Sequence, residues 1–431
     1  MPSETTLPKL RRRLIPFLFL LYVVAYLDRV NVGFAALEMN AALGFSAAVY
    51  GLGSGIFFLS YTAFEVPSNL LLARFGARVW IARIMATWGL VSSAMLFVSD
   101  ETTFYTLRFL LGVAEAGFFP GIIYYLTRWF PARERAHAVA LFMTATAMAG
   151  VIGAPISSAL LAMHGAFGLD GWQWLFLIEG IPAIVLAPVV LKYLDETPAD
   201  AAWLDPDERA WLSTELARER TQDDGAHHAF GDALRSGRLW ALSLLYFCIV
   251  MAFYGVSFWL PQIVQSVAGL GAVQVALISA IPYVAAALGM AAIGRRSDRT
   301  GERRWHVAVP ALVGAAGFVL ATLVSTSLAL SLLALSIAAL GIWGALGPFW
   351  AMPAAFLRGT AAAGGIAVVN SVGNLGGFVG PALVGYAREW TGSFAGGLLL
   401  LSGTLVAGAA VALLLPKTPA PTAGPPPAAS R

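Results

Sequence analysis

Long apolar runs separated by short polar connections fill most of the chain. About 20 apolar residues in a helix span the ~30 Å hydrocarbon core of a bilayer, and twelve runs reach roughly that length. They cover residues 14–37, 50–74, 79–98, 103–130, 136–162, 172–193, 237–266, 273–294, 304–325, 327–350, 360–388 and 393–415. The pattern predicts an all-α membrane protein with twelve transmembrane helices.

The composition and the placement of basic residues agree with this prediction. Of the 431 residues, 58% are hydrophobic and 12% are charged, against about 25% charged in a soluble domain. Basic residues lie at connections on one side: Arg11 to Arg13, Arg74, Arg78, Arg128, Arg133, Arg135, Lys192, the loop from Arg209 to Arg238, Arg295 to Arg304, Arg358 and Lys417. Arg388 is the clear exception. The positive-inside rule therefore predicts cytoplasmic termini and a cytoplasmic middle loop, in the inner membrane of the cell.

Several classes of chemistry find no support in the sequence. The single cysteine, Cys248, excludes an internal disulfide and a cysteine metal cluster. The five histidines are scattered through the connections without metal-ligand spacing, and glycine-rich runs such as 149–153 lie inside apolar segments, where they cannot cradle a phosphate. We therefore expect no enzyme, no metal, no cofactor beyond an ion gradient and no nucleic-acid partner. The bilayer is the expected environment, and we expect a monomer.

Two sequence matches indicate that a six-helix unit occurs twice. The stretch Ala73-Arg-Phe-Gly-Ala-Arg78 matches Asp298-Arg-Thr-Gly-Glu-Arg303 at an offset of 225. The stretch Gly150-Val-Ile-Gly-Ala-Pro155 matches Gly376-Gly-Phe-Val-Gly-Pro381 at an offset of 226. Repeats of this kind place a substrate site near the midplane between the halves. We therefore predict two pseudo-symmetric bundles, at 1–193 and 236–415, a cytoplasmic linker at 194–235 and a disordered tail at 416–431.

The linker contains one predicted helix. Asp205 is placed as its N-cap, Pro206 as its first residue and Glu208 as the closing member of a capping box. The helix, from Glu208 to about residue 220, carries an apolar stripe of Trp211, Leu212 and Leu216 that meets either the membrane surface or the protein. We interpret the linker as a tether between the halves rather than a separate binding module.

Charged residues inside the apolar runs are the strongest functional signal. A charge near the middle of a bilayer costs roughly 2.5–3.5 kcal/mol on insertion scales, so such residues usually face a cavity or a partner. Arg108 and Glu115 share one helical face but stand about 10.5 Å apart along the axis, so they cannot pair directly. Each requires another group: a residue on another helix, a proton on Glu115, or an anionic ligand on Arg108.

The first run contains a second pair of charges, Asp28 and Arg29. Adjacent helical residues point about 100° apart, so at most one of the two faces a central cavity squarely. They either pair with charges on neighbouring helices or form part of a binding face. The stripe of Tyr22, Tyr26 and Arg29 favours the second interpretation, because it is too wide for one structural ion pair.

These residues lie in motifs that resemble the major facilitator superfamily, and within it the anion:cation symporters of organic acids such as tartrate, phthalate, nicotinate and sugar acids. The motifs are Tyr26-Leu-Asp28-Arg29-Val-Asn31, the segment from Arg108 to Pro120, Arg128-Trp-Phe-Pro-Ala-Arg-Glu-Arg135, the segment from Gly294 to Arg304, and Asn370-Ser-Val-Gly-Asn374-Leu-Gly-Gly. The first copy of the loop motif departs from the pattern, with Asn69 and Ala73 where the second has Gly294 and Asp298. The first loop therefore lacks the usual carboxylate lock.

The resemblance implies roles for the buried charges. Arg29 and Arg108 match positions that clamp the substrate carboxylate, and Asp28 and Glu115 match positions implicated in proton coupling. General chemistry agrees with these roles, since guanidinium binds carboxylate through two parallel hydrogen bonds and a buried carboxyl group can hold a proton near neutral pH.

Other candidates come from the same resemblance. Tyr61 matches a ligand-contacting tyrosine, and Tyr26 lies on the stripe of Arg29. In the second half, Trp350, Asn370 and Asn374 are the candidates, with Trp259 and Gln262 weaker, and each tryptophan is otherwise a packing or interfacial residue. We interpret Glu65 and Glu179 as structural, and Asp298, Arg299 and Arg304 as gating residues in a cytoplasmic connection.

The leading functional hypothesis is an alternating-access symporter that imports a small organic anion together with protons, with sodium not excluded. One alternative is a transporter-like receptor that binds the anion and signals through the middle loop. Another is an exporter of cationic or amphipathic drugs, which would need buried carboxylates without paired buried arginines. Arg29 and Arg108 argue against the exporter.

Overall fold

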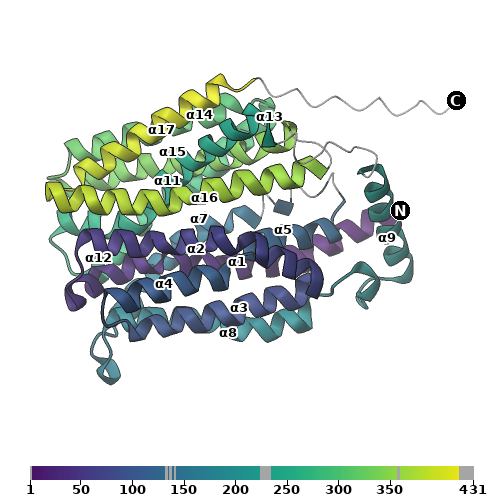
Figure 1. Ribbon diagram of the computed structural model, residues 1–431, viewed down its shortest axis with the longest axis horizontal. Helices are drawn as coiled ribbons and strands as arrows, with labels where there is room; N and C mark the ends of the chain where they lie inside the picture. The colour runs from purple at the N-terminus through teal and green to yellow at the C-terminus, as the bar shows by residue number, and fades with distance from the viewer. Residues whose placement is uncertain are drawn as a thin grey trace.

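The computed structural model describes residues 2–131, 134, 138, 139, 142–223, 234–356 and 360–416, and regular structure in this part of the chain is entirely helical. The long helices run side by side along one axis, with α9 and the N-terminus at the same end (Figure 1). The first half comprises α1 (Pro2–Leu43), α2 (Ala47–Phe75), α3 (Ala77–Ala94), α4 (Glu101–Glu115), α5 (Phe118–Trp129), α7 (Ala145–Leu161) and α8 (Gly171–Tyr193). The second half comprises α11 (Gly237–Ala268), α12 (Ala272–Ile278), α13 (Ala280–Thr300), α14 (Arg304–Leu323), α15 (Leu328–Phe356), α16 (Thr360–Thr391) and α17 (Ala395–Leu414).

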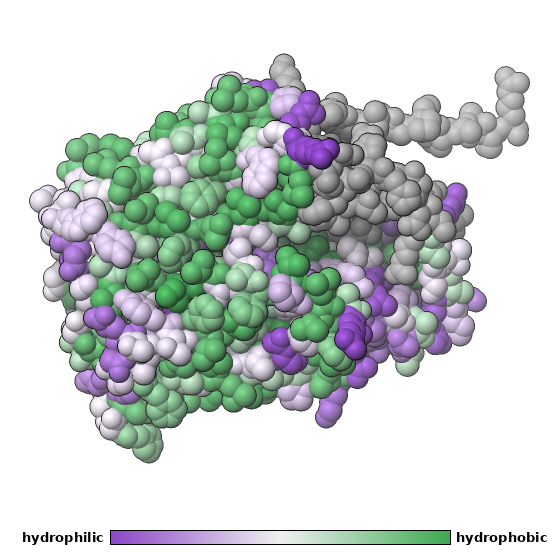
Figure 2. Space-filling view, in the orientation of Figure 1, coloured by the Kyte–Doolittle hydropathy of each residue, from purple (hydrophilic) through white to green (hydrophobic). Residues whose placement is uncertain are grey.

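Eleven helical segments in the described ranges are long and apolar enough to cross a membrane, and α7 is a shorter apolar helix. This result confirms the predicted twelve-helix fold. Hydrophobic residues cover most of the visible side of the bundle, whereas hydrophilic residues gather toward its ends (Figure 2). Leu70 and Leu288 are 68% and 65% exposed, as expected for side chains that face lipid. The predicted run 136–162 falls partly on residues outside those described.

Two of the predicted runs are not single helices. The run 103–130 divides into α4 and α5 at Ala116 and Gly117, where Gly117 has φ +88° in the left-handed region that favours glycine. The Ser68 hydroxyl donates to the carbonyl of Ala116 at 2.6 Å and satisfies a group near the break. The run 273–294 likewise divides into α12 and α13 at Ser279. The first break lies immediately after Glu115, so α4 ends on a buried carboxylate.

The halves meet chiefly where α2 packs on α16, α1 on α11, and α7 on α12 and α13. Small residues allow the backbones to approach closely. A Cβ at Gly51 would lie 2.6 Å from the carbonyl oxygen of Pro381, and one at Gly55 would lie 2.6 Å from that of Phe378. These glycines of α2 therefore allow its backbone to lie close to that of α16.

The linker helix α9 (Pro206–Asp223) forms where the sequence predicts it. The Glu208 carboxylate accepts from the backbone N–H of Asp205 at 3.2 Å, which is one half of a capping box. Leu212 and Leu216 are buried, and α9 packs on α1 and α5. The apolar stripe therefore faces the protein rather than the membrane surface. Residues 224–233 of the linker and 417–431 of the tail lie outside the described residues, and the domain boundaries stay a prediction.

The predicted topology places α9 and the connection before α4 on opposite sides of the membrane. In a Cys248→Ala background, single cysteines at the exposed positions Ser213 and Thr102 are expected to react with a membrane-impermeant thiol reagent from opposite sides. Labelling of intact cells and of inverted vesicles checks this expectation. If both cysteines react from one side, the one-sided distribution of arginines does not report the topology.

Candidate functional site

The buried charges of the first half form an ion pair that reaches into the second half. Arg29 on α1 and Glu115 at the end of α4 form a buried salt bridge, and both side chains are almost fully enclosed. The guanidinium also donates through Nη1 to the hydroxyl oxygen of Tyr254 on α11 at 3.1 Å. Three helices, one of them from the other half, therefore converge on one cation.

Aromatic rings enclose the same guanidinium. Its central carbon lies 5.3 Å from the ring centroid of Phe57, 5.4 Å from Tyr61 and 5.8 Å from Tyr26. Rings within about 6 Å attract a cation through their quadrupole. Tyr26 and Tyr61, both predicted to contact substrate, thus lie beside Arg29.

Arg108 is fully buried, and Glu115 pairs with Arg29 rather than with Arg108, in agreement with the axial separation that the sequence predicts. Its Nη2 donates to the carbonyl of Ser54 at 2.9 Å and its Nε to that of Gly53 at 3.4 Å, whereas Nη1 has no hydrogen-bond partner in the described part of the chain. Close packing of α2 on α4 brings these carbonyls within reach, since a Cβ at Gly112 would overlap the Phe57 carbonyl oxygen. A guanidinium with one unfilled donor can accept an anionic ligand.

Asp28 points away from the ion pair, toward α3. It accepts hydrogen bonds from the side chains of Asn31, Trp88 and Ser92, and it forms no salt bridge with an arginine among the described residues. The prediction that only one of Asp28 and Arg29 faces the centre squarely agrees with this arrangement.

The candidates of the second half are less directly placed. The Asn370 amide donates to Glu65 Oε1 at 2.7 Å, and the Ser371 hydroxyl donates to Glu65 Oε2 at 3.1 Å, so Glu65 links α2 to α16. Asn374, one turn further along α16, is also buried. Trp350 packs edge-on against Tyr246 at 4.8 Å, and its indole N–H has no partner among the described residues. The hydrogen bonds of Arg29 and Arg108 described above involve none of these candidates.

The weaker candidates and the gating candidates make other contacts. Trp259 donates to the carbonyl of Pro381 at 3.0 Å, and Gln262 accepts from Asn40 at 3.1 Å. Asp298 pairs with Arg303 at 2.7 Å, and Arg304 donates to the carbonyl of Leu413. The interactions of Asp298 and Arg304 lie within the second half. A gating role for these two residues and for Arg299 stays a prediction.

Tyr254 is a candidate that the sequence reasoning missed. It lies 225 residues after Arg29, which is the offset of the internal repeat. It is therefore the second-half counterpart of Arg29, and the repeat could have identified it. The two equivalent positions meet across the pseudo-symmetric interface.

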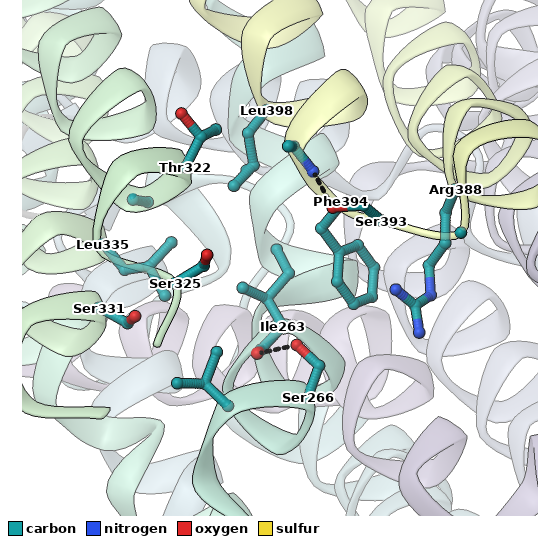
Figure 3. A pocket seen from close by; sticks show the side chains of 14 residues that line it. Ile263, Ser266, Thr322, Ser325, Ser331, Leu335, Arg388, Ser393, Phe394 and Leu398 are labelled. Atoms are coloured by element: carbon teal, nitrogen blue, oxygen red, sulfur yellow. Dashed lines mark hydrogen bonds between the residues drawn. The ribbon is translucent and has the colours of Figure 1, made fainter. Parts of the chain in front are cut away.

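A pocket of about 340 Å³ lies apart from these charges, between helices of the second half. Figure 3 shows Arg388 beside Phe394 at its edge, with the guanidinium carbon 3.9 Å from the ring centroid. Three of its hydroxyls, on Ser266, Thr322 and Ser331, already donate to main-chain carbonyls. They present lone pairs rather than hydrogens, so the pocket suits an anion poorly despite its arginine.

Comparison with known proteins identifies the family. A family model described as Major Facilitator Superfamily matches residues 18–381. The chain belongs to the major facilitator superfamily. It is 52% identical, over 412 residues, to an Agrobacterium vitis protein provisionally named a tartrate transporter, covering 96% of this chain and 95% of that one. It is also 42% identical, over 397 residues, to a quinolone resistance transporter of Acinetobacter baumannii, covering 92% of this chain and 91% of that one.

A solved structure shows the same fold. The bacterial homologue of the human lysosomal transporter Spinster, in an inward-facing and occupied conformation, aligns with a TM-score of 0.75 at 18% identity, covering 94% of this chain and 96% of that one. The superfamily membership makes this protein a membrane transporter rather than an enzyme.

The close packing of α2 against α4 at Gly112 can be tested by substitution. Gly112→Ala is expected to destabilise the protein by about 1–3 kcal/mol, because the added methyl group overlaps the α2 backbone and forces a shift. The thermal unfolding midpoint of the purified protein should fall, and transport should fall with it. Gly403→Ala is the matched control, since nothing lies within 4 Å of its added Cβ. Equal unfolding midpoints for the two variants would contradict this packing.

Proposed function

We propose that this transporter imports a small organic anion with a carboxylate group, together with protons, by alternating access. The observation that carries the proposal is the pair of buried arginines. Arg29 is neutralised by one exchangeable carboxylate, that of Glu115, and Arg108 retains an unfilled donor, Nη1. Both guanidinium groups can bind a carboxylate through parallel hydrogen bonds. The 52% identity to the Agrobacterium vitis protein supports this substrate class.

Exchange at Arg29 provides the coupling step. When the substrate carboxylate takes the place of Glu115 on Arg29, Glu115 is left buried without its cation. An isolated buried charge is costly, and a carboxylate in that position takes up a proton instead. Anion binding and protonation of Glu115 are therefore linked at one site. Asp28, which precedes Arg29 on α1, is proposed as a further proton acceptor.

The electrical balance requires such a step. Import of an anion against an inside-negative potential costs about 2.3 kcal/mol per charge per 100 mV. Co-transport of more than one proton per monoanion makes the cycle net positive, so the potential drives uptake. Because Arg29 contacts Tyr254 of the second half, substrate that binds there would also change the contact between the halves. Trp350, Asn370 and Asn374 are proposed to complete the site from that half.

Drug export is the second candidate, and the 42% identity to the quinolone resistance transporter favours it. A cationic drug would bind next to buried carboxylates that lack arginine partners. Here the central carboxylate Glu115 is already paired with a buried arginine, and a second buried arginine lies on the same helix. Organic anions are the better match.

Reconstituted uptake tests the proposal. Proteoliposomes with an alkaline interior, in sodium-free buffer, are offered labelled tartrate, phthalate, hydroxybenzoates, nicotinate and sugar acids. At least one acid should accumulate while the pH gradient lasts. Arg108→Lys keeps the charge but loses the planar fork, so the apparent affinity should fall about ten- to hundredfold, as expected for losing a charged hydrogen bond of about 1.5–3 kcal/mol.

Matched controls decide what each result means. The lysine variant should reach the membrane in wild-type amount, which quantitative blotting checks. If it transports with unchanged affinity, Arg108 is a structural residue and the clamp lies elsewhere. Binding of an acid without uptake would favour the receptor. If no acid accumulates but a cationic drug leaves the vesicles when the gradient is reversed, the exporter is correct.

A further inference from the structure

Another buried carboxylate, that of Glu179, lies on α8. The side chain of Glu179 is 6% exposed. Its Oε1 accepts from the Ser157 hydroxyl on α7 at 3.0 Å, and its Oε2 is buried without a hydrogen-bond partner in the described part of the chain. A buried ionised oxygen with no donor is costly, so this atom requires an explanation.

No cation in the described part of the chain forms a salt bridge with this carboxylate. α8 packs on α1, α3 and α7. Its charged neighbour on α1 is Asp28, which is also negative, and the neighbouring polar groups are Asn31 and Ser157. Arg29 also lies in the middle of α1, but its guanidinium pairs with Glu115. Other charged residues of the packed helices lie toward the helix ends, among them Glu38, Arg78, Arg83 and Lys192. Gly180, the residue after Glu179, packs against Gly89 of α3. Arg83 lies six residues before Gly89, about 9 Å along the helix axis, and its guanidinium lies over the ring of Trp80.

The two neighbouring carboxylates are unequally supplied with donors. Asp28 accepts from Asn31, Trp88 and Ser92, which stabilises its ionised form. Among the described residues, Glu179 accepts from the Ser157 hydroxyl at Oε1, and it adjoins Asn31, whose amide already donates to Asp28. When two nearby carboxyl groups cannot both ionise, the one with fewer donors keeps the proton.

The side-chain amide of Asn31, which adjoins both carboxylates, also lacks a hydrogen bond. Asn31 donates Nδ2 to Asp28 at 3.1 Å and also adjoins Glu179. Its Oδ1 is buried and receives no hydrogen bond from the described residues. One proton on Glu179 removes the uncompensated charge and adds a hydrogen-bond donor to a group of side chains that includes Asn31.

We propose that Glu179 is a proton-binding site, loaded in this conformation and joined to Asp28 through Asn31. The proposal rests on the proposed proton symport and names a group that takes part in it. Glu115 is paired with Arg29, and Asp28 accepts hydrogen bonds from three side chains. Glu179 therefore holds the proton while Glu115 and Asp28 are ionised. When a change of conformation withdraws the α3 donors from Asp28, the proton leaves Glu179 Oε2 and binds the Asp28 carboxylate. Asp28 precedes Arg29 on α1, so this transfer brings the proton nearer to the central ion pair.

Infrared spectroscopy of the reconstituted full-length protein reads this proton without substrate. At neutral pH the wild type should show a carboxylic-acid C=O band, and Glu179→Gln should remove it. Glu65→Gln is the matched control, because Glu65 is also a buried carboxylate but both of its oxygens accept hydrogen bonds. The control should leave the band in place. If the wild type lacks the band, or if Glu179→Gln leaves it unchanged, Glu179 does not hold a proton and the proposal fails.

Transport measurements separate a proton site from a packing residue. Glu179→Gln should lose at least tenfold in accumulation driven by a pH gradient but keep counterflow exchange within about twofold of the wild type. Gradient-driven accumulation equal to wild type would overturn the coupling role. Should Glu179→Gln fail to fold, Ser157→Ala serves instead: it removes the hydrogen bond to Oε1, so the band should persist to higher pH than in the wild type. An unshifted band would again contradict the proposal.

The two proposals fail in different ways. An infrared band that depends on Glu179, in a protein that accumulates none of the offered acids, would refute the proposed transport function and leave the proton site standing. Uptake of an acid without that band would do the reverse.

Discussion

The fold of the first half depends on one requirement: the guanidinium of Arg29, buried among apolar helices, must have a counter-ion. Glu115 supplies it. A buried ion pair adds little net stability relative to apolar packing, because desolvation offsets the attraction, yet removing one partner costs about 3–5 kcal/mol. Such a pair is poorly suited to being broken and well suited to an exchange of partners. A substrate carboxylate that takes over Arg29 and a proton that takes over Glu115 satisfy both charges at once.

Local features of the helices support this exchange. α4 ends on Glu115, and the left-handed Gly117 follows it, so the carboxylate stands at a break rather than inside a continuous helix. Close approach of α2 to α4 provides backbone carbonyls for Arg108. The cations and carboxylates lie in the first half, while the second half contributes Tyr254. The site is therefore asymmetric although the fold repeats.

The sequence predicts the parts of this structure that depend on length and periodicity. Twelve apolar runs, one repeat offset and the linker helix are all visible without a structure. Partners across helices are not, because periodicity gives the face of a residue but not the axial position of its neighbour. This is why the partner of Glu115 remained open between a proton and a residue on another helix. For the same reason, the sequence predicts a substrate contact for Asn370 but not the hydrogen bond that its amide donates to Glu65.

Other differences have local physical causes. A glycine inside an apolar run is compatible with an unbroken helix, so the break at Gly117 could not be distinguished from close packing. The sequence favours a structural role for Glu179 inside an apolar run, but it does not show which groups meet its oxygens. One of these oxygens lacks a donor among the described residues, a property that only coordinates reveal. Tyr254 could have been found, since the repeat offset maps Arg29 onto it.

Competition between the substrate carboxylate and Glu115 for Arg29 is the central claim, and the protons taken up on binding test it most directly. Calorimetric titration of the purified protein with a transported acid, in buffers of different ionisation enthalpy at one pH, gives this number. Exchange at Arg29 predicts that the wild type takes up protons when the anion binds. The Glu115→Gln variant should take up fewer protons than the wild type, with a difference of up to one proton per anion. Anion binding without proton uptake in the wild type, or with equal uptake in both proteins, would contradict it.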